Sequence, residues 1–273
     1  MHLTKLRKGA ALAAVTALSL LVAACFFAPG KFVSDLTVGK DRSFSFHYAG
    51  EIYLLPLAEA SKKAEFKPDT CYDDDLNERA CNSDELAEQK QNWQREQDEK
   101  KKSDAQAAQY MFGGINPSDP KAAEEIADRM RRQAGWNKVE YLGNGKYDVD
   151  FAISGKLDRD FAFPSVERFP MANAFVQLSV RGDGTVRIDA PGFGPASSTM
   201  GTAAMMQGMS LKDDNAELQG AAADGTFTLH TDAQVLANNT DEGPVRTAKG
   251  SDLTWKVNAR SPAAPTALIK FAP

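Results

Sequence analysis

The chain has 273 residues, of which 42% are hydrophobic and 25% charged, a composition typical of globular proteins. Its 37 acidic and 32 basic side chains give a net charge of −5. An acidic chain is poorly suited to bind nucleic acid, so we exclude nucleic acid as the main partner. The length is sufficient for a domain with a substantial hydrophobic core.

Residues 1–24 have the pattern of an export signal. The first eight positions hold three lysine or arginine residues and no acidic residue, and positions 10–24 are almost wholly apolar. A basic start, an apolar middle and small residues at the end are the three parts of a signal peptide. The apolar run is shorter than the roughly 20 residues that a spanning helix needs. We therefore predict that 1–24 is a signal peptide.

The signal ends in Leu-Val-Ala-Ala-Cys at 21–25, a run that resembles the lipobox of bacterial lipoprotein precursors. The resemblance implies cleavage before Cys25 and acylation of this residue, palmitate included. Several acyl chains would attach the protein stably to a membrane. Phe26 stands where an aspartate would retain the protein in the inner membrane, which implies the periplasmic face of the outer membrane. The alternative is an ordinary signal peptide with a chance cysteine near its cleavage site.

Residues 25–30 are predicted to form a short tether, and residues 31–273 a single domain. The pattern over 32–38 predicts a strand, and 43–55 a longer one that ends at Pro56.

A polar segment follows these strands and is predicted to be an insertion over 57–112. Residues 57–66 are helix-like, and Ser83 is expected to cap a helix that is polar on nearly all sides and ends near Tyr110. Such a helix is exposed to solvent or lies against another molecule.

Cys71 and Cys81 remain as a pair once Cys25 is acylated. In an oxidising compartment we predict that they form a disulfide. A loop this short would gain roughly 2–3 kcal/mol from the cross-link. The alternatives are two free thiols or part of a metal site.

The sequence after residue 112 predicts one helix among short strands. This helix is expected to begin at Asp119-Pro120 and to end at Gly135. Segments 156–173 and 191–210 are rich in Phe/Pro and in Gly/Ser/Ala/Met, and we expect them to be mobile flaps. The fold class is therefore α+β: an antiparallel sheet of about eight strands, one packed helix and a helical, disulfide-bearing insertion. The later strands are expected at 138–142, 146–154, 175–180, 185–189, 226–231, 233–238, 253–258 and 267–271.

No recognised catalytic or cofactor motif occurs in the sequence. The residues after the signal include two histidines, His47 and His230, and these are too few for a metal site unless carboxylates join them. We therefore predict no catalytic residues, no cofactor and no metal site, and leave ligand-binding residues unassigned. The acidic pairs 148/150 and 158/160 each lie two residues apart, as on one strand face. Strand alternation alone explains the first pair, and paired-carboxylate catalysis is not the preferred interpretation of either.

Two further segments resemble metal-binding patterns in part. Asp73, Asp75 and Asn77 have the spacing of a calcium loop start, but Glu78 stands at the position that needs glycine. Four methionines at 200–209 are suited to Cu(I), but no histidine or cysteine lies nearby. A solvated acidic loop and a soft apolar loop are the preferred interpretations.

The order of elements resembles the periplasmic domain of mycobacterial LppM-type lipoproteins. The resemblance rests on an early strand pair, on a helix followed by Trp-Asn-Lys-Val-Glu-Tyr at 136–141, and on Leu-Thr-Trp-Lys-Val at 253–257. It implies a domain that binds envelope lipids or glycolipids, and it assigns no binding residue. The insertion at 57–112 departs from this pattern.

We therefore expect a non-enzymatic, membrane-anchored lipoprotein that binds a lipid or another apolar envelope molecule. The aromatic sheet faces and the two expected flaps motivate this hypothesis. The alternative interpretation of the aromatic residues is simple core packing. The alternative is a structural or assembly subunit that docks on an envelope protein through the helix over 82–110, because that helix has little apolar surface to bury within its own chain.

Overall fold

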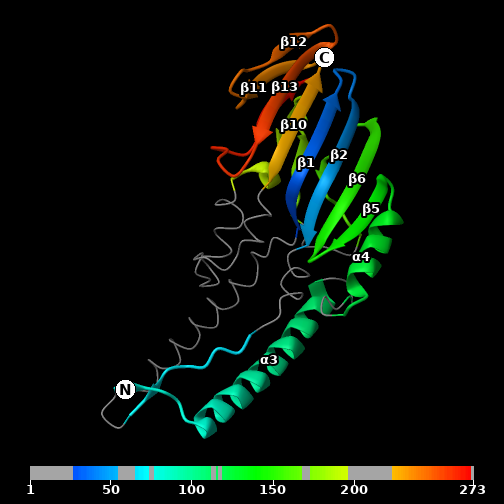
Figure 1. The fold of residues 1–273 in the computed structure, drawn as a ribbon. Coiled ribbons are helices and arrows are strands. Elements are labelled where there is room, and N and C mark those ends of the chain that lie inside the picture. The colour runs from blue at the N-terminus through cyan, green and yellow to red at the C-terminus, as the bar shows by residue number, and fades with distance from the viewer. Residues whose placement is uncertain are drawn as a thin grey trace, which may run out of the picture.

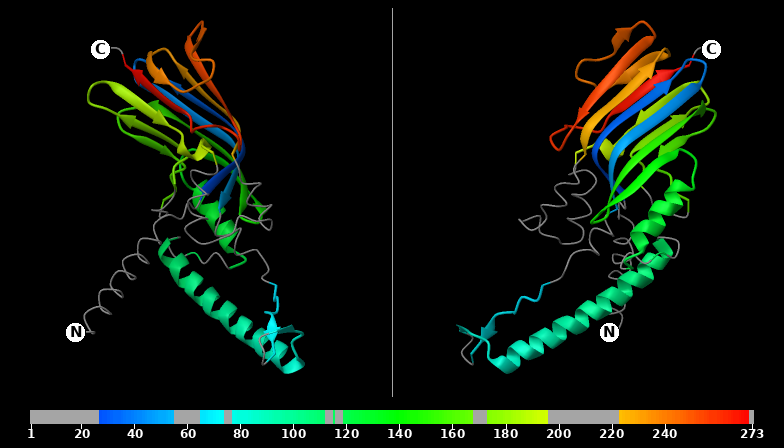
Figure 2. Two further views of the ribbon diagram at one scale, coloured as in Figure 1. Left: turned by 90° about the vertical axis from the view of Figure 1, so that its left-hand side faces the viewer. Right: turned by 45° about the vertical axis from the view of Figure 1, so that its right-hand side comes forward.

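The computed structural model describes residues 27–54, 65–73, 77–111, 115, 119–167, 173–195 and 223–271. These residues form two β-sheets that pack face to face, together with two α-helices (Figures 1 and 2). The α+β character of the prediction is confirmed. A single antiparallel sheet of about eight strands is wrong, because the described strands divide among a seven-stranded sheet, a five-stranded sheet and a separate two-stranded one.

The seven-stranded sheet has the order β12-β13-β10-β1-β2-β6-β5. Neighbouring strands are antiparallel except β1 and β10, which run parallel. Gly225 makes that close approach possible, because a Cβ atom there would lie 2.0 Å from the carbonyl oxygen of Phe32. The strands of this sheet are β1 (Phe27–Val38), β2 (Ser43–Leu54), β5 (Trp136–Gly143), β6 (Lys146–Lys156), β10 (Asp224–Thr231), β12 (Val245–Thr247) and β13 (Gly250–Val257).

The five-stranded sheet has the order β11-β14-β9-β8-β7 and is antiparallel throughout. Sequence alternation shows which side of each strand is buried but does not show which strand lies beside it. The division into two sheets was therefore missed, although the predicted hairpins at β5–β6 and β8–β9 are confirmed. The strands of this sheet are β7 (Phe161–Phe163), β8 (Val176–Val180), β9 (Thr185–Asp189), β11 (Gln234–Asn238) and β14 (Thr266–Lys270).

Aromatic side chains fill the space between the two sheets. The ring of Phe163, from the smaller sheet, lies 4.7 Å from that of Phe151, 5.0 Å from that of Tyr48 and 5.1 Å from that of Phe46. All four side chains are buried. Rings at these separations add attraction beyond the area that they bury. The alternative interpretation of the aromatic residues, core packing, is therefore confirmed for these four side chains.

The described parts of the two expected flaps belong to the packed structure and are not flaps. Within 156–173, Phe163 belongs to strand β7 and is completely buried, so this part is a sheet edge. Within 191–210, the short 3₁₀ helix Pro191–Phe193 inserts Phe193 into the core, where its ring stacks 4.2 Å from Phe32. Residues 168–172 and 196–222 lie outside the described residues.

The packed helix is α4 (Ala122–Arg131), which lies beside β5 (Figure 1). The predicted apolar stripe is confirmed, since its alanine, isoleucine and methionine side chains are buried. Tyr147 on β6 donates a buried hydrogen bond to the carbonyl of Ala123 and so fastens the helix to the sheet. The helix begins later than predicted: Asp119 accepts a bond from the amide of Lys121 and does not cap the helix with its side chain.

Strand β1 begins at Phe27, so the tether predicted over 25–30 is wrong from that residue onward. Phe27 is 1% exposed, and Asn173 holds its backbone through two hydrogen bonds, as acceptor and as donor. The first strand of the fold therefore begins two residues after Cys25. Cys25 itself lies outside the described residues.

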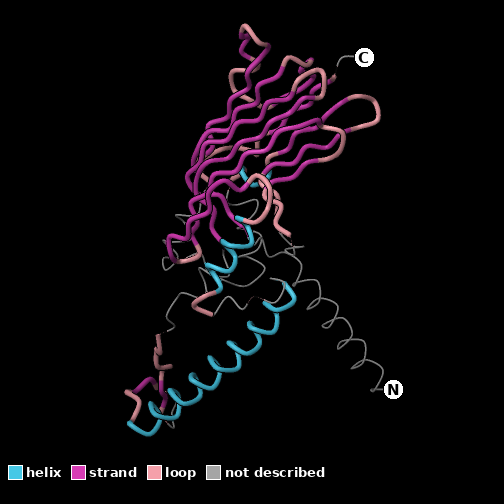
Figure 3. The backbone as a smooth tube through the Cα atoms, turned by 90° about the vertical axis from the view of Figure 1, so that its right-hand side faces the viewer, coloured by secondary structure: helices cyan, strands magenta, loops and turns pink. Residues whose placement is uncertain are grey.

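The insertion contains the short strands β3 (Cys71–Tyr72) and β4 (Glu78–Arg79) and the helix α3 (Ser83–Met111). Figure 3 shows α3 extending away from the body of strands. Its polar character is confirmed. None of the helices in the described ranges is long and apolar enough to span a membrane. The helix expected over 57–66 falls largely outside the described residues.

Candidate functional site

The strongest candidate site is the segment 65–111, which we call the arm. Its first part, 65–70, runs beside helix α3. The ring of Phe66 lies 5.8 Å from that of Trp93 in an edge contact. Gln89 exchanges hydrogen bonds with the backbone of Asp69: its side-chain oxygen accepts from the Asp69 amide at 2.9 Å, and its side-chain nitrogen donates to the Asp69 carbonyl at 3.4 Å. The arm is therefore held together by contacts of its own.

The far end of the arm, residues 69–89, is the arm tip. Here Cys71 and Cys81 form the predicted disulfide, with their Cα atoms 5.2 Å apart. The side-chain nitrogen of Gln89 lies 3.5 and 3.8 Å from the two sulfur atoms, so the bridge rests on the first turns of α3. The disulfide thus joins the small β3–β4 hairpin to the start of the helix.

The start of α3 is closed by a reciprocal cap. The side-chain oxygen of Asn82 accepts bonds from the amides of Asp84 and Glu85, and Glu85 accepts one from the amide of Asn82 at 2.8 Å. This is a capping box, in which two residues satisfy each other's free donors. The predicted cap, Ser83, is wrong by one position, because Asn82 fits the same pattern with Glu85 three residues later.

Glu85 also links the helix to the hairpin. Its two oxygens accept bonds from the guanidinium of Arg79, at 2.5 and 2.8 Å. Such forked pairs fix geometry better than single ion pairs. The bond from Arg79, followed by that from the Asn82 amide, lowers the pKa of Glu85 to about 2. The carboxylate therefore stays charged and bonded over the whole neutral and mildly acidic range.

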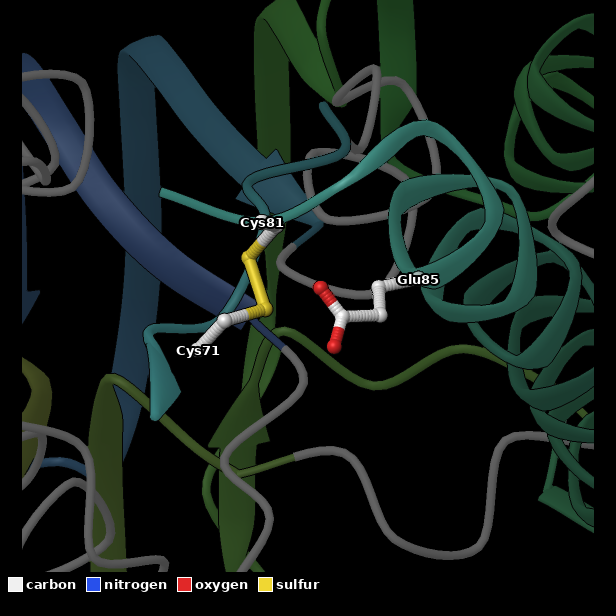
Figure 4. A group of neighbouring side chains, drawn as sticks. All are labelled: Cys71, Cys81 and Glu85. Atoms are coloured by element: carbon white, nitrogen blue, oxygen red, sulfur yellow. A yellow bond between two sulfur atoms is a disulfide. The ribbon is translucent and has the colours of Figure 1, made fainter. Parts of the chain in front are cut away.

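Figure 4 shows the Glu85 carboxylate directed toward the disulfide. The ligand atoms of Cys71, Cys81 and Glu85 lie within 4.8 Å of one another. Metal binding requires thiolates, and these sulfurs are bonded to each other. The three residues therefore form a structural junction, and the alternative of a metal site at these cysteines is not supported.

The calcium-like spacing at 73–77 has a local explanation as well. Asp73 accepts a bond from the amide of Asn77 at 2.8 Å and two longer ones from its side chain, which closes the hairpin turn. Asp75 lies outside the described residues. Most of the acidic excess of the chain is concentrated here: residues 69–89 contain eight acidic side chains and one basic side chain.

The structure places both histidines on the outer face of the seven-stranded sheet. His47 on β2 lies 3.2 Å from Asp150, and His230 on β10 lies 2.8 Å from Asp252. Asp148 is paired with Lys138, and Asp160 accepts a bond from the backbone of Val180. Neither acidic pair therefore forms two facing carboxylates.

The remaining predicted positions are not part of the described chain. These are the acylation residue Cys25 and the methionines at 200–209. Sequence reasoning missed Gln89 and the Arg79–Glu85 pair. The spacing of Asn82 and Glu85 was the available signal for the cap.

Comparison with known proteins adds one distant structural similarity. No protein-family model matches the sequence, and no curated protein matches it. Among solved structures, the chain is similar to the NMR structure of the folded domain of the Mycobacterium tuberculosis LppM protein. The identity is 12%, the match covers 90% of this chain and 92% of that chain, and the TM-score is 0.33. This is the type of lipoprotein that the sequence resembles. We transfer no ligand, partner or residue role across so distant a match.

The arm tip should loosen in acid through Glu85. Because its folded pKa of about 2 lies below its ordinary value of 4.5, its contribution to stability is complete above 4.5 and is lost as the pH falls toward 2. NMR signals of the Asn82, Asp84 and Glu85 amides should shift and exchange faster over this interval. In the Glu85→Gln variant, which retains a capping side chain, this change should be largely absent. An unchanged acid transition in the variant would assign it to other groups.

Proposed function

We propose that this chain is a non-enzymatic, membrane-anchored lipoprotein that docks through its arm tip on a basic surface of an envelope protein. The observation that carries the proposal is the construction of the tip. A disulfide (Figure 4), a capping box and a forked ion pair fix the end of a helix that extends away from the sheets (Figure 2). Such preorganisation lowers the cost of binding.

The shape and exposure of the arm support this function. Helix α3 has 29 residues, which corresponds to a length of about 43 Å. A helix with so little apolar surface adds little to a hydrophobic core. Tyr72 and Leu86, at the tip, are 50% and 37% exposed. Aromatic side chains placed in this way are common anchors of protein interfaces.

The charge of the tip indicates the kind of partner. A net charge of −7 over residues 69–89 compares with −8 for the whole chain after residue 24. Complementary charge guides association and favours partners of opposite sign. We therefore propose a protein surface rich in lysine and arginine as the occupant.

The proposed lipid anchor at Cys25 would determine where in the cell envelope the protein lies. Acylation of Cys25 would attach a membrane two residues before the buried Phe27. The sandwich would then stand close to the bilayer, and the sorting pattern at residue 26 favours the periplasmic face of the outer membrane. Binding of a lipid or another apolar molecule stays a prediction. The aromatic side chains were its main support, and they pack in the core, so they are not free to line a binding site.

The anchor is tested by Cys25→Ala. Without acyl chains the protein loses its stable attachment. We expect the variant in the soluble envelope fraction and the unaltered protein in the membrane fraction, with mass spectrometry detecting acyl chains on Cys25 of the latter. Cys25→Ala that stays in the membrane fraction would contradict the proposed anchor.

Docking is tested with a photo-crosslinking residue at position 72 in cells. A matched control carries it at 142, because Leu142 on β5 is also 50% exposed. We expect one discrete adduct from 72, identified as a protein with a basic surface, and none of that size from 142. Tyr72→Ala should then weaken binding of the purified partner about tenfold, which corresponds to a typical interface anchor.

Equal adducts from both positions would contradict docking at the tip. Lipid extraction of the purified protein provides the second measurement. A stoichiometric lipid together with no adduct from position 72 would favour the apolar-ligand hypothesis instead.

A further inference from the structure

The charges of helix α3 are divided along its length. Its first turns belong to the acidic arm tip, where residues 69–89 carry a net charge of −7. The next stretch, residues 90–102, has five basic and three acidic side chains, a net charge of +2. It ends in three consecutive lysines at 100–102, which we call the lysine run. The arm therefore has an acidic end and a basic middle on one helix.

The lysine run has no partner within the described part of the chain. All three side chains are exposed, and none of them forms an ion pair or a hydrogen bond there. Glu96 and Asp98 stand four residues before Lys100 and Lys102, a spacing that allows ion pairs within a helix. No such pair forms among these described residues. The lysines are therefore available to another molecule.

Two apolar side chains lie between the acidic and the basic parts of α3. Leu86 is 37% exposed, and Trp93, which contacts Phe66, is half-buried. Leu86, Trp93 and Lys100 stand seven residues apart, which is close to two helical turns, so they lie along one face of α3. Trp93 is the midpoint of this line, because about 10.5 Å of helix separates it from each of the other two.

We propose that the partner of the arm tip is a second copy of this chain, whose α3 lies antiparallel to the first with a two-fold axis near Trp93. The inference rests on the docking proposed above and names its partner. The axis places the lysine run of each copy beside residues 84–88 of the other, so opposite charges meet at both ends of the contact. A parallel pair would place one acidic tip against the other, and like charges would repel.

The antiparallel contact is self-complementary, as a two-fold dimer requires. One surface supplies acidic side chains at one end, an apolar centre and lysines at the other end, and the same surface of the second copy fits it in reverse. The arm extends away from the strands, so two arms can pair without contact between the two sandwiches (Figure 3). Anchoring of both copies in one membrane would raise their effective concentration and favour a weak contact of this kind.

The inference is tested with two full-length copies that carry different epitope tags and are expressed together. One copy carries the photo-crosslinking residue at position 72, in the arm tip. We expect an adduct that holds both tags, with its second end mapped by mass spectrometry to residues 94–104 of the other copy. An adduct with a different protein, or with the sandwich of the second copy, would overturn the inference and leave tip docking standing. No adduct at all would contradict both.

Charge reversal provides a second measurement. The run-reversed variant carries Lys100→Glu, Lys101→Glu and Lys102→Glu, and the tip-reversed variant carries Glu78→Lys, Asp84→Lys and Glu88→Lys. These acidic side chains form no bond within the described residues, and the capping residues Asn82 and Glu85 are unaltered. Each variant expressed alone should lose about tenfold of the two-copy adduct, because the opposite charges are gone. The two variants expressed together should recover it, because the reversed tip meets the reversed run.

The matched control is Asp241→Lys combined with Glu242→Lys, which reverses two exposed acidic charges between β11 and β12. It should form as much adduct as the unaltered chain, and an unchanged melting temperature of the sandwich should show that every variant folds. No recovery when the two variants are expressed together, or an equal loss in the control, would overturn the inference.

Discussion

The contact of aromatic rings between the two sheets is the constraint on which the rest of the structure depends. Phe163 is the centre of this contact, with rings of the larger sheet around it. Because this core extends to Phe27, the first strand is committed to the sandwich immediately after the expected acylation residue. The same packing buries the apolar side chains of the inner faces, so the outer face of the larger sheet carries mainly polar side chains.

The arm depends on different interactions. It has few large apolar side chains, and its end is stabilised by a cross-link, a cap and an ion pair around Glu85. A short disulfide loop contributes roughly 2–3 kcal/mol and a helix cap about 1 kcal/mol. Such local contributions can order the tip without any help from the aromatic core. The chain thus combines a hydrophobic sandwich with a polar arm, and an anchor at Cys25 would hold both near a membrane.

Local patterns in the sequence predicted the hairpins, the apolar stripe of α4 and the disulfide, because each depends on neighbours within a short stretch of chain. Sheet membership could not be predicted in this way. The parallel pairing of β1 with β10 joins distant segments, and the Phe/Pro-rich segment around Phe163 has the composition of a loop although it supplies the core. The pairing of His47 with Asp150 and of His230 with Asp252 was hidden for the same reason: alternation places each residue on a face, but strand order decides its neighbours.

The contacts of the two parts indicate that the sandwich and the arm are stabilised separately. Hydrogen exchange of the processed chain, measured by mass spectrometry before and after reduction of the Cys71–Cys81 disulfide, tests it most directly. We expect faster exchange confined to residues 71–111, while the amides of β1, β2 and β6 keep their protection. Equal loss of protection in those strands would contradict it, because the cross-link would then support the core.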